Sequence, residues 1–201
     1  MFHWQDILDF WFGDLSPEGL PDTYHRQRWF TNDRGFDREI RRRFLSSLLL
    51  IAEDGMPEWL ESPGGLLASI IVLDQFSRNI HRGTAMAFEY DAKARHLCRQ
   101  GLARGLDVAL PAVQRAFFYM PFQHSERLAD QEEGVALFEQ LAATFRDTEK
   151  TLLDGFAASA REHAELIRRF GRFPHRNRVL KRANTEDEER YLAEKPKSFG
   201  Q

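Results

Sequence analysis

A continuous apolar run followed at once by a dense polar cluster is the feature that most restricts how this chain can fold. Between Leu66 and Leu73 almost every side chain is apolar. A helix formed there has no polar face and must be buried, and Pro63 suits the first turn of such a helix. Six polar side chains follow within nine residues: Asp74, Gln75, Arg78, Asn79, His81 and Arg82. The stretch 62–82 therefore predicts a buried central helix whose end carries groups that need polar partners.

The rest of the chain repeats the helical spacing of apolar residues. No segment alternates with the period of a strand, and no Asn-Gly or Asp-Gly turn separates two apolar runs. Helices are expected at 3–12, from Phe36 to Ile51, from Thr84 to about Arg104, from Pro111, from Ser125, from Thr148 or Thr151 to Phe170, and after Thr185. Pro121 is expected to kink or end its helix. The sequence predicts an all-α protein of about eight to ten helices.

Length and composition favour a single helical domain over residues 1–201, with 194–201 as a frayed tail. The only cysteine, Cys98, excludes an internal disulfide and fits a reducing, cytoplasmic environment. The N-terminus has no basic region of a secretory signal, and the longest uncharged run is too short to cross a membrane. We therefore expect a soluble cytoplasmic protein with no membrane partner.

A basic run with interleaved phenylalanines, at 168–182, is the only sequence feature that suggests nucleic acid. Four acidic residues follow it at 186–189, and the formal net charge of the chain is −3. Because this charge opposes binding to a phosphate backbone, a nucleic-acid partner is not expected.

Three polar motifs, far apart in the sequence, are expected to meet around one cavity. They lie at 74–82, at 119–130 around Pro121, and at 170–178 after a helix stop at Gly171. Each places long polar side chains at a helix end, where backbone groups also lack partners. This convergence is the main functional prediction from the residues.

An anion site is the first chemistry that the three motifs suggest, because guanidinium groups bind phosphate or carboxylate with paired hydrogen bonds. The predicted ligand-binding residues are Asp74, Gln75, Arg78, Asn79, Arg82, Arg172, Arg176 and Asn177. The competing interpretation is a structural network without a ligand. Its pairs would be Asp74 with Arg78, and Glu126 or Asp130 with Arg172 or Arg176.

Acid–base or metal-assisted catalysis is the second chemistry, and its side chains are His124, Glu126, Asp130, His163 and His175. The candidate catalytic residues among them are His124, Glu126 and His175. In this hypothesis His124 or His175, tuned by Glu126 or Asp74, moves a proton. The competing interpretation makes His124 a satisfied histidine and Ser125 a simple helix cap. Neither H-E-x-x-H nor Glu-x-x-His occurs, so no metal ligand is predicted, and the sequence identifies no cofactor.

The motifs LDQFSRN, YMPFQHSE and FGRFPHRN, in this order and spacing, resemble the bacterial family called domain of unknown function 924. The pairs Trp29-Phe30 and Phe36-Asp37 and the ending from Thr185 to Leu192 also fit this family. One departure is Lys181, where the family pattern has glycine. The resemblance implies a helical fold similar to tetratricopeptide-repeat superhelices, or an irregular helical bundle, and it implies no activity.

Two functional hypotheses follow from the sequence. The first is a small-molecule site, binding or enzymatic, for a phosphate- or carboxylate-bearing ligand. The second is a helical module that binds a protein partner, in which the polar motifs only hold helices together. A ligand site requires the motifs to converge on a cavity open to solvent, whereas the second hypothesis buries and pairs every group.

Overall fold

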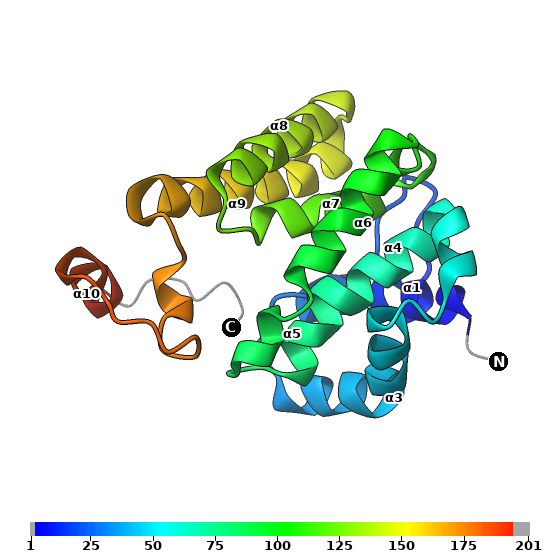
Figure 1. The fold of residues 1–201 in the computed structure, drawn as a ribbon. Helices are drawn as coiled ribbons and strands as arrows, with labels where there is room; N and C mark the ends of the chain where they lie inside the picture. Colours follow the sequence, from blue (N-terminus) through cyan, green and yellow to red (C-terminus); the bar gives the residue numbers. More distant parts are fainter. Residues whose placement is uncertain (1–2, 195–201) are drawn as a thin grey trace.

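In the computed structural model, which describes residues 3–194, every regular element is a helix (Figure 1). The α-helices are α1 (Trp4–Phe12), α2 (Thr23–Arg28), α3 (Arg34–Ala52), α4 (Pro63–Ile71), α5 (Ser77–Ile80), α6 (Asp91–Ala103), α7 (Ala112–Gln123), α8 (Leu128–Thr144), α9 (Asp147–Phe170) and α10 (Glu186–Ala193). Short 3-10 helices are η1 (Pro57–Glu61), η3 (Ala85–Phe88), η4 (Asp107–Ala109) and η5 (Pro174–Arg176). The all-α prediction is confirmed for the described residues.

The predicted central helix is present, but a wider turn divides it. Helix α4 passes into the π-helix η2 (Val72–Phe76), where the Ser77 N–H bonds the Val72 carbonyl five residues earlier, and α5 follows. Each residue from Leu66 to Leu73 is at most 1% exposed, as the absence of a polar face predicts. Helices α1, α3, α6 and α7 pack around this central segment.

The second half of the fold is formed by α7, α8 and α9. Helices α8 and α9 lie side by side, and α7 packs against both (Figure 1). Phe117 on α7 joins the two halves, because its ring contacts Trp11, Trp29 and Phe156 at centroid distances of 5.7, 4.6 and 5.7 Å. Aromatic pairs of this kind fix helix positions through shape as well as through buried area.

Two local predictions were wrong. The helix expected from Thr84 begins at Asp91, after η3. Ser125 is not a helix N-cap, because α8 begins three residues later; its Oγ instead accepts the Arg127 N–H and donates to Asp130. Pro121, which was expected to kink or end its helix, lies in the last turn of α7, and the helix ends two residues later at Gln123. A proline less than one turn from the helix end removes one backbone hydrogen bond without interrupting a long ladder.

The end of the chain is described as far as Glu194. Thr185 and Glu188 form the predicted capping box of α10, with each side chain bonding the other residue's backbone N–H. The predicted frayed tail at 194–201 lies outside the described residues, apart from Glu194 itself. Across residues 3–194, no helix combines the length and the apolar character needed to cross a bilayer.

Candidate functional site

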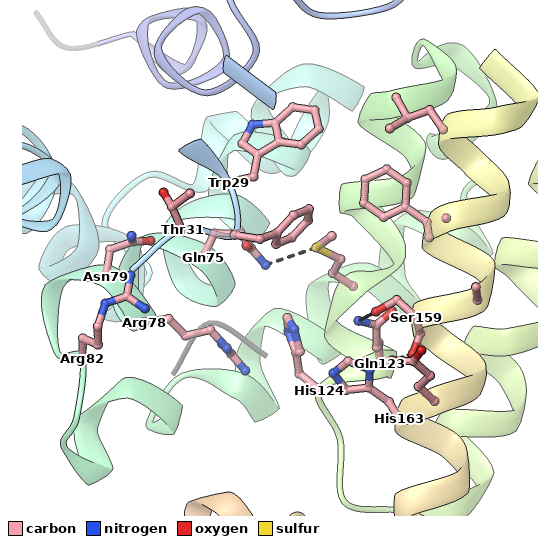
Figure 2. A pocket seen from close by; sticks show the side chains of 17 residues that line it. Trp29, Thr31, Gln75, Arg78, Asn79, Arg82, Gln123, His124, Ser159 and His163 are labelled. Carbon is pink, nitrogen blue, oxygen red and sulfur yellow. Dashed lines mark hydrogen bonds between the residues drawn. The ribbon is translucent and has the colours of Figure 1, made fainter. Parts of the chain in front are cut away.

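A cavity of about 680 Å³ lies between the two halves of the fold. Its walls come from the segment after α2, from η2 and α5, from α7 and from α9 (Figure 2). The lining residues are Trp29, Phe30, Thr31, Gln75, Arg78, Asn79, Arg82, Met120, Gln123, His124, Leu152, Gly155, Phe156, Ala158, Ser159, Glu162 and His163. Asn79, Arg78 and Arg82 face it from one side, whereas Gln123, His124, Ser159 and His163 gather on the other (Figure 2).

A buried Asp–His pair forms the chemical centre of this cavity. His124 caps the C-terminus of α7, and its Nδ1 lies 2.7 Å from Oδ1 of Asp74 on the π-helix. The Asp74 side chain is fully buried, whereas that of His124 keeps 14% exposure. The Gln75 amide donates to the other Asp74 oxygen, at 2.5 Å. Residues 50 positions apart are thus joined by the meeting of η2 and α7.

The tautomer of His124 follows from the ionisation of its partner. Burial opposes ionisation of Asp74, but His124 and Arg78 together lower the pKa of Asp74 to about 2. Burial, and then the nearby Arg78 charge, lower the pKa of His124 below its usual value, against the opposing effect of Asp74. At neutral pH a neutral imidazole therefore donates Nδ1–H to a carboxylate, and the lone pair is on Nε2.

A second buried histidine, His163 on α9, lies beside the first. The two ring centroids are 6.3 Å apart, and His163 Nδ1 lies 2.8 Å from the Ser159 carbonyl oxygen. Because a carbonyl only accepts, Nδ1 must carry the proton. Burial lowers the pKa of His163 to about 3, so this ring is also neutral at physiological pH.

Arg78 is held by two carboxylates. Its NH1 lies 3.2 Å from Oδ1 of Asp74 and 2.9 Å from Oδ1 of Asp91, and NH1 also donates to the Asp74 carbonyl. The predicted Asp74–Arg78 pair is therefore present. Asp91 extends the network to Arg176, whose NH1 lies 3.5 Å from Oδ2. Two guanidinium groups and two carboxylates balance one another in this buried cluster.

Asn79 and Arg82 share a carboxylate that sequence reasoning did not include in the site. Asp37 on α3 accepts from Asn79 Nδ2 at 2.9 Å and from Arg82 Nε and NH2 at 2.7 and 2.8 Å. This fork-to-carboxylate geometry holds the guanidinium plane against α3. The expected cavity position of both residues is observed, but the Arg82 guanidinium already has an internal counterion.

The third motif does not reach the cavity. Arg172 binds Glu188 of α10 through Nε and NH2, at 2.6 and 2.7 Å. Glu126 binds Arg182 at 2.6 Å and accepts the Phe173 N–H, rather than pairing with Arg172 or Arg176. The expectation that all predicted site residues surround one cavity therefore fails for Glu126, Arg172, His175, Arg176 and Asn177, which do not line it. Asp74 does not line it either and is connected to it through His124.

Arg176 comes nearest to the cavity network among the residues of the third motif. It is 5% exposed, and its guanidinium lies over the rings of Phe88 and Phe173 at 4.3 and 4.5 Å. Burial lowers its pKa to about 10, against the effect of Asp91. Burial likewise lowers the pKa of His175 to about 3. Arg176 connects the C-terminal segment to Asp91 and so to Arg78, without lining the cavity.

Asp130 also differs from the sequence expectation. It pairs with Arg95 and Arg99, at 3.0 and 2.7 Å, instead of with the third motif. Its other contact is the hydroxyl of Ser125, at 2.6 Å. This cluster joins α6 to α8, so Asp130 belongs to helix packing and not to the cavity.

The residues that sequence reasoning missed come mainly from α9 and the segment after α2. Ser159 and His163 are four residues apart on α9, and Trp29 lies at the end of α2. His163 was among the sequence candidates for acid–base chemistry, and Ser159, one turn earlier on the same face of the amphipathic helix α9, is the residue that this spacing could have added. Nothing local marks Asp37 or Asp91, because their partners lie elsewhere in the chain.

Lys181, which departs from the family pattern, has φ of +55°. This is the left-handed region that glycine occupies at little steric cost. The backbone turn thus survives without the glycine, and Arg182 is still placed to bind Glu126. No group of three or more His, Cys, Asp or Glu side chains suited to a metal ion occurs within residues 3–194.

Comparisons with known proteins match the fold over nearly the whole chain. No curated protein matches the chain. A protein of unknown function from Agrobacterium tumefaciens, ATU0120, has a similar solved structure, with 34% sequence identity and a TM-score of 0.81. The alignment covers 95% of this chain and 97% of that one. The family model described as "Bacterial protein of unknown function (DUF924)" matches residues 7–196. The chain belongs to the DUF924 family.

Proposed function

We propose that the cavity is the active site of an enzyme in which His124 acts as a general base on a small molecule. The observation that carries the proposal is the 2.7 Å contact between His124 Nδ1 and the buried carboxylate of Asp74. Such a partner fixes the tautomer and the ring orientation and stabilises the imidazolium that forms after proton transfer. His124 Nε2 then accepts a proton from a bound hydroxyl group or water.

The surroundings of the dyad suit this role. Arg78 and Gln75 hold Asp74 in its ionised state, so the dyad does not depend on solvent for its geometry. The cavity volume of about 680 Å³ is in the usual range for a small-molecule site. The π-helix that carries Asp74 is also a local distortion of a kind found often at functional sites.

The charges of the cavity wall favour binding of a polar group of a ligand over binding of a free anion. Arg78 faces Asp74 and Asp91, and Arg82 faces Asp37, so the positive charges on this wall already have internal counterions. Guanidinium groups such as these suit a carbonyl, hydroxyl or carboxylate group of the substrate. The substrate can therefore carry an anionic group, but the proposed function of the cavity is proton transfer and not anion binding.

Hydrolysis of p-nitrophenyl acetate, a small aromatic ester, tests the proposed chemistry. We expect the rate of the wild-type protein to exceed that of His124→Gln at least tenfold, as for other general bases. Asp74→Asn should also lower the rate, because a neutral amide no longer favours the required tautomer. His96→Gln is the matched control, since His96 is exposed on α6.

The ionisation state of the dyad provides a second readout that needs no substrate. ¹⁵N NMR of the labelled protein at pH 7 should show a protonated Nδ1 and an unprotonated Nε2 for His124. Equal hydrolysis by the wild type, His124→Gln and His96→Gln would contradict the proposed function. So would a His124 ring that is doubly protonated at pH 7.

A further inference from the structure

One cavity residue, Gln123, has an amide oxygen that is buried and unused. Its side chain lies on the last turn of α7 and is 5% exposed. Nε2 donates to the Ser159 hydroxyl at 3.3 Å, whereas Oε1 has no hydrogen-bond partner among the described residues. An unpaired buried acceptor costs free energy in the empty protein. A ligand that supplies a donor would remove this cost.

One helical turn away from Ser159, the cavity lining is open at Gly155, which is exposed. Gly155 and Ser159 both line the cavity and are four residues apart on α9, so they lie on one face about 5–6 Å from each other. A Cβ added at Gly155 would meet no atom within 4 Å. The absence of a side chain here leaves room beside Ser159.

Aromatic side chains line the same cavity. The Trp29 and Phe30 rings lie 6.4 and 6.2 Å from the ring of Phe156, and all three residues line the cavity. Met120 and Leu152 complete the apolar lining. Flat rings packed at these distances favour an aromatic guest, which gains edge and face contacts in addition to buried area.

From these observations we infer that the substrate of this cavity is an aromatic molecule whose ring occupies the space at Gly155 and whose N–H or O–H group donates to Gln123 Oε1. The inference rests on the proposed use of the cavity as a small-molecule site and defines the class of that molecule. Gln123 and Gly155 are then specificity-determining residues: the first requires a donor, and the second admits the ring.

Indole and benzofuran form a matched pair of probes for this inference. The two molecules have nearly the same shape, but the indole ring nitrogen carries a hydrogen and the benzofuran oxygen only accepts. We expect isothermal titration calorimetry of the whole chain to show indole binding about tenfold more tightly, which corresponds to one hydrogen bond to a buried acceptor. Gln123→Met, which keeps the volume of the side chain and removes the acceptor, should abolish this preference.

Gly155→Leu tests the position of the ring. Leucine at this point would fill the open space and should weaken the binding of both probes at least tenfold. Asp154→Leu adds the same side chain at the neighbouring exposed position, which does not line the cavity, and should leave both affinities unchanged. Circular dichroism of each variant confirms that the helices are retained.

Each result has a definite meaning. Equal affinities, or a preference for benzofuran, in the wild-type protein would overturn the requirement for a donor, and unchanged binding in Gly155→Leu would overturn the position of the ring. Indole binding to His124→Gln separates this inference from the proposed function. If that variant discriminates like the wild type and hydrolyses the ester equally well, the proposed function fails and the ligand class stands.

Discussion

At the scale of single residues, Asp74 is the group on which most of the site depends. Its side chain accepts from His124 and Gln75 and pairs with Arg78, while its own exposure is zero. A buried carboxylate is stable only when such partners replace the lost hydration. The same contacts that make Asp74 tolerable in the core also orient the imidazole at the cavity.

A double-mutant cycle on Asp74 and Arg78 tests this dependence. Either single substitution, Asp74→Ala or Arg78→Ala, should lower the free energy of unfolding by about 3–5 kcal/mol, because each removes one partner of a buried charge. The double variant should lose less than the sum, because it leaves neither charge of the pair behind in the core. Denaturant unfolding measures all four proteins. Strictly additive losses would show that the two residues are independent.

At the scale of helices and turns, the π-helix η2 decides which side chains face the cavity. The extra residue in this turn rotates the positions that follow it relative to those before it. Asp74 and Gln75 lie in the wide turn, and Arg78 and Asn79 lie just after it. The rotation lets Gln75 and Arg78 line the same cavity while Leu66–Leu73 stay entirely in the core.

Two glycines on different helices should respond to alanine in opposite directions. At Gly65 in α4, an added Cβ would lie 2.3 Å from the backbone oxygen of Trp59. Gly65→Ala should therefore cost about 1–3 kcal/mol of stability through overpacking against η1. At Gly155 in α9 there is open space, so Gly155→Ala should stabilise by roughly 0.5–1 kcal/mol through helix propensity.

Thermal or denaturant unfolding of the two alanine variants provides the comparison. The Gly155 variant also serves as the control for any general effect of replacing glycine with alanine in a helix. If Gly65→Ala were as stable as the wild type, η1 would have to move freely relative to α4. That result would contradict the tight packing of these two elements.

At the scale of the whole molecule, buried neutral histidines make global stability depend on pH. Burial lowers the pKa of both His163 and His175 from 6.5 to about 3. Between these values the unfolded chain binds more protons than the folded one, so the free energy of unfolding falls as the pH drops from 6.5 towards 3. The carboxylate of Asp74, with a pKa lowered to about 2 from 3.8, contributes only below about pH 4.

His163→Gln should reduce the slope of unfolding free energy against pH between 6.5 and 4.5. The physical reason is that the substituted residue no longer takes up a proton on unfolding. Urea unfolding at several pH values measures the slope, and His96→Gln, at an exposed position, should retain the wild-type value. An unchanged slope in His163→Gln would mean that this imidazole is already protonated in the native protein.

Local patterns in the sequence determined most of the helices and the identity of the buried segment. Apolar spacing located α1, α3 and α9, and the all-apolar run located the core at Leu66–Leu73. The Asp74–Arg78 pair could also be predicted from the sequence, because residues four apart share a helix face. Each of these results depends on neighbours in the chain, so periodicity and side-chain chemistry were sufficient.

Tertiary structure alone decided which polar groups became the site. In the sequence, the three arginines Arg78, Arg82 and Arg172 are equivalent hydrogen-bond donors. Helix packing places them beside Asp91, Asp37 and Glu188, respectively. It also brought His124 to Asp74 across 50 positions and left the third motif outside the cavity. Ion pairs between distant segments depend on how the helices cross. Before the core is formed, each arginine could pair with any of several carboxylates, so the sequence pattern alone does not determine the partner. Helix packing fixes the distances and so selects one pair.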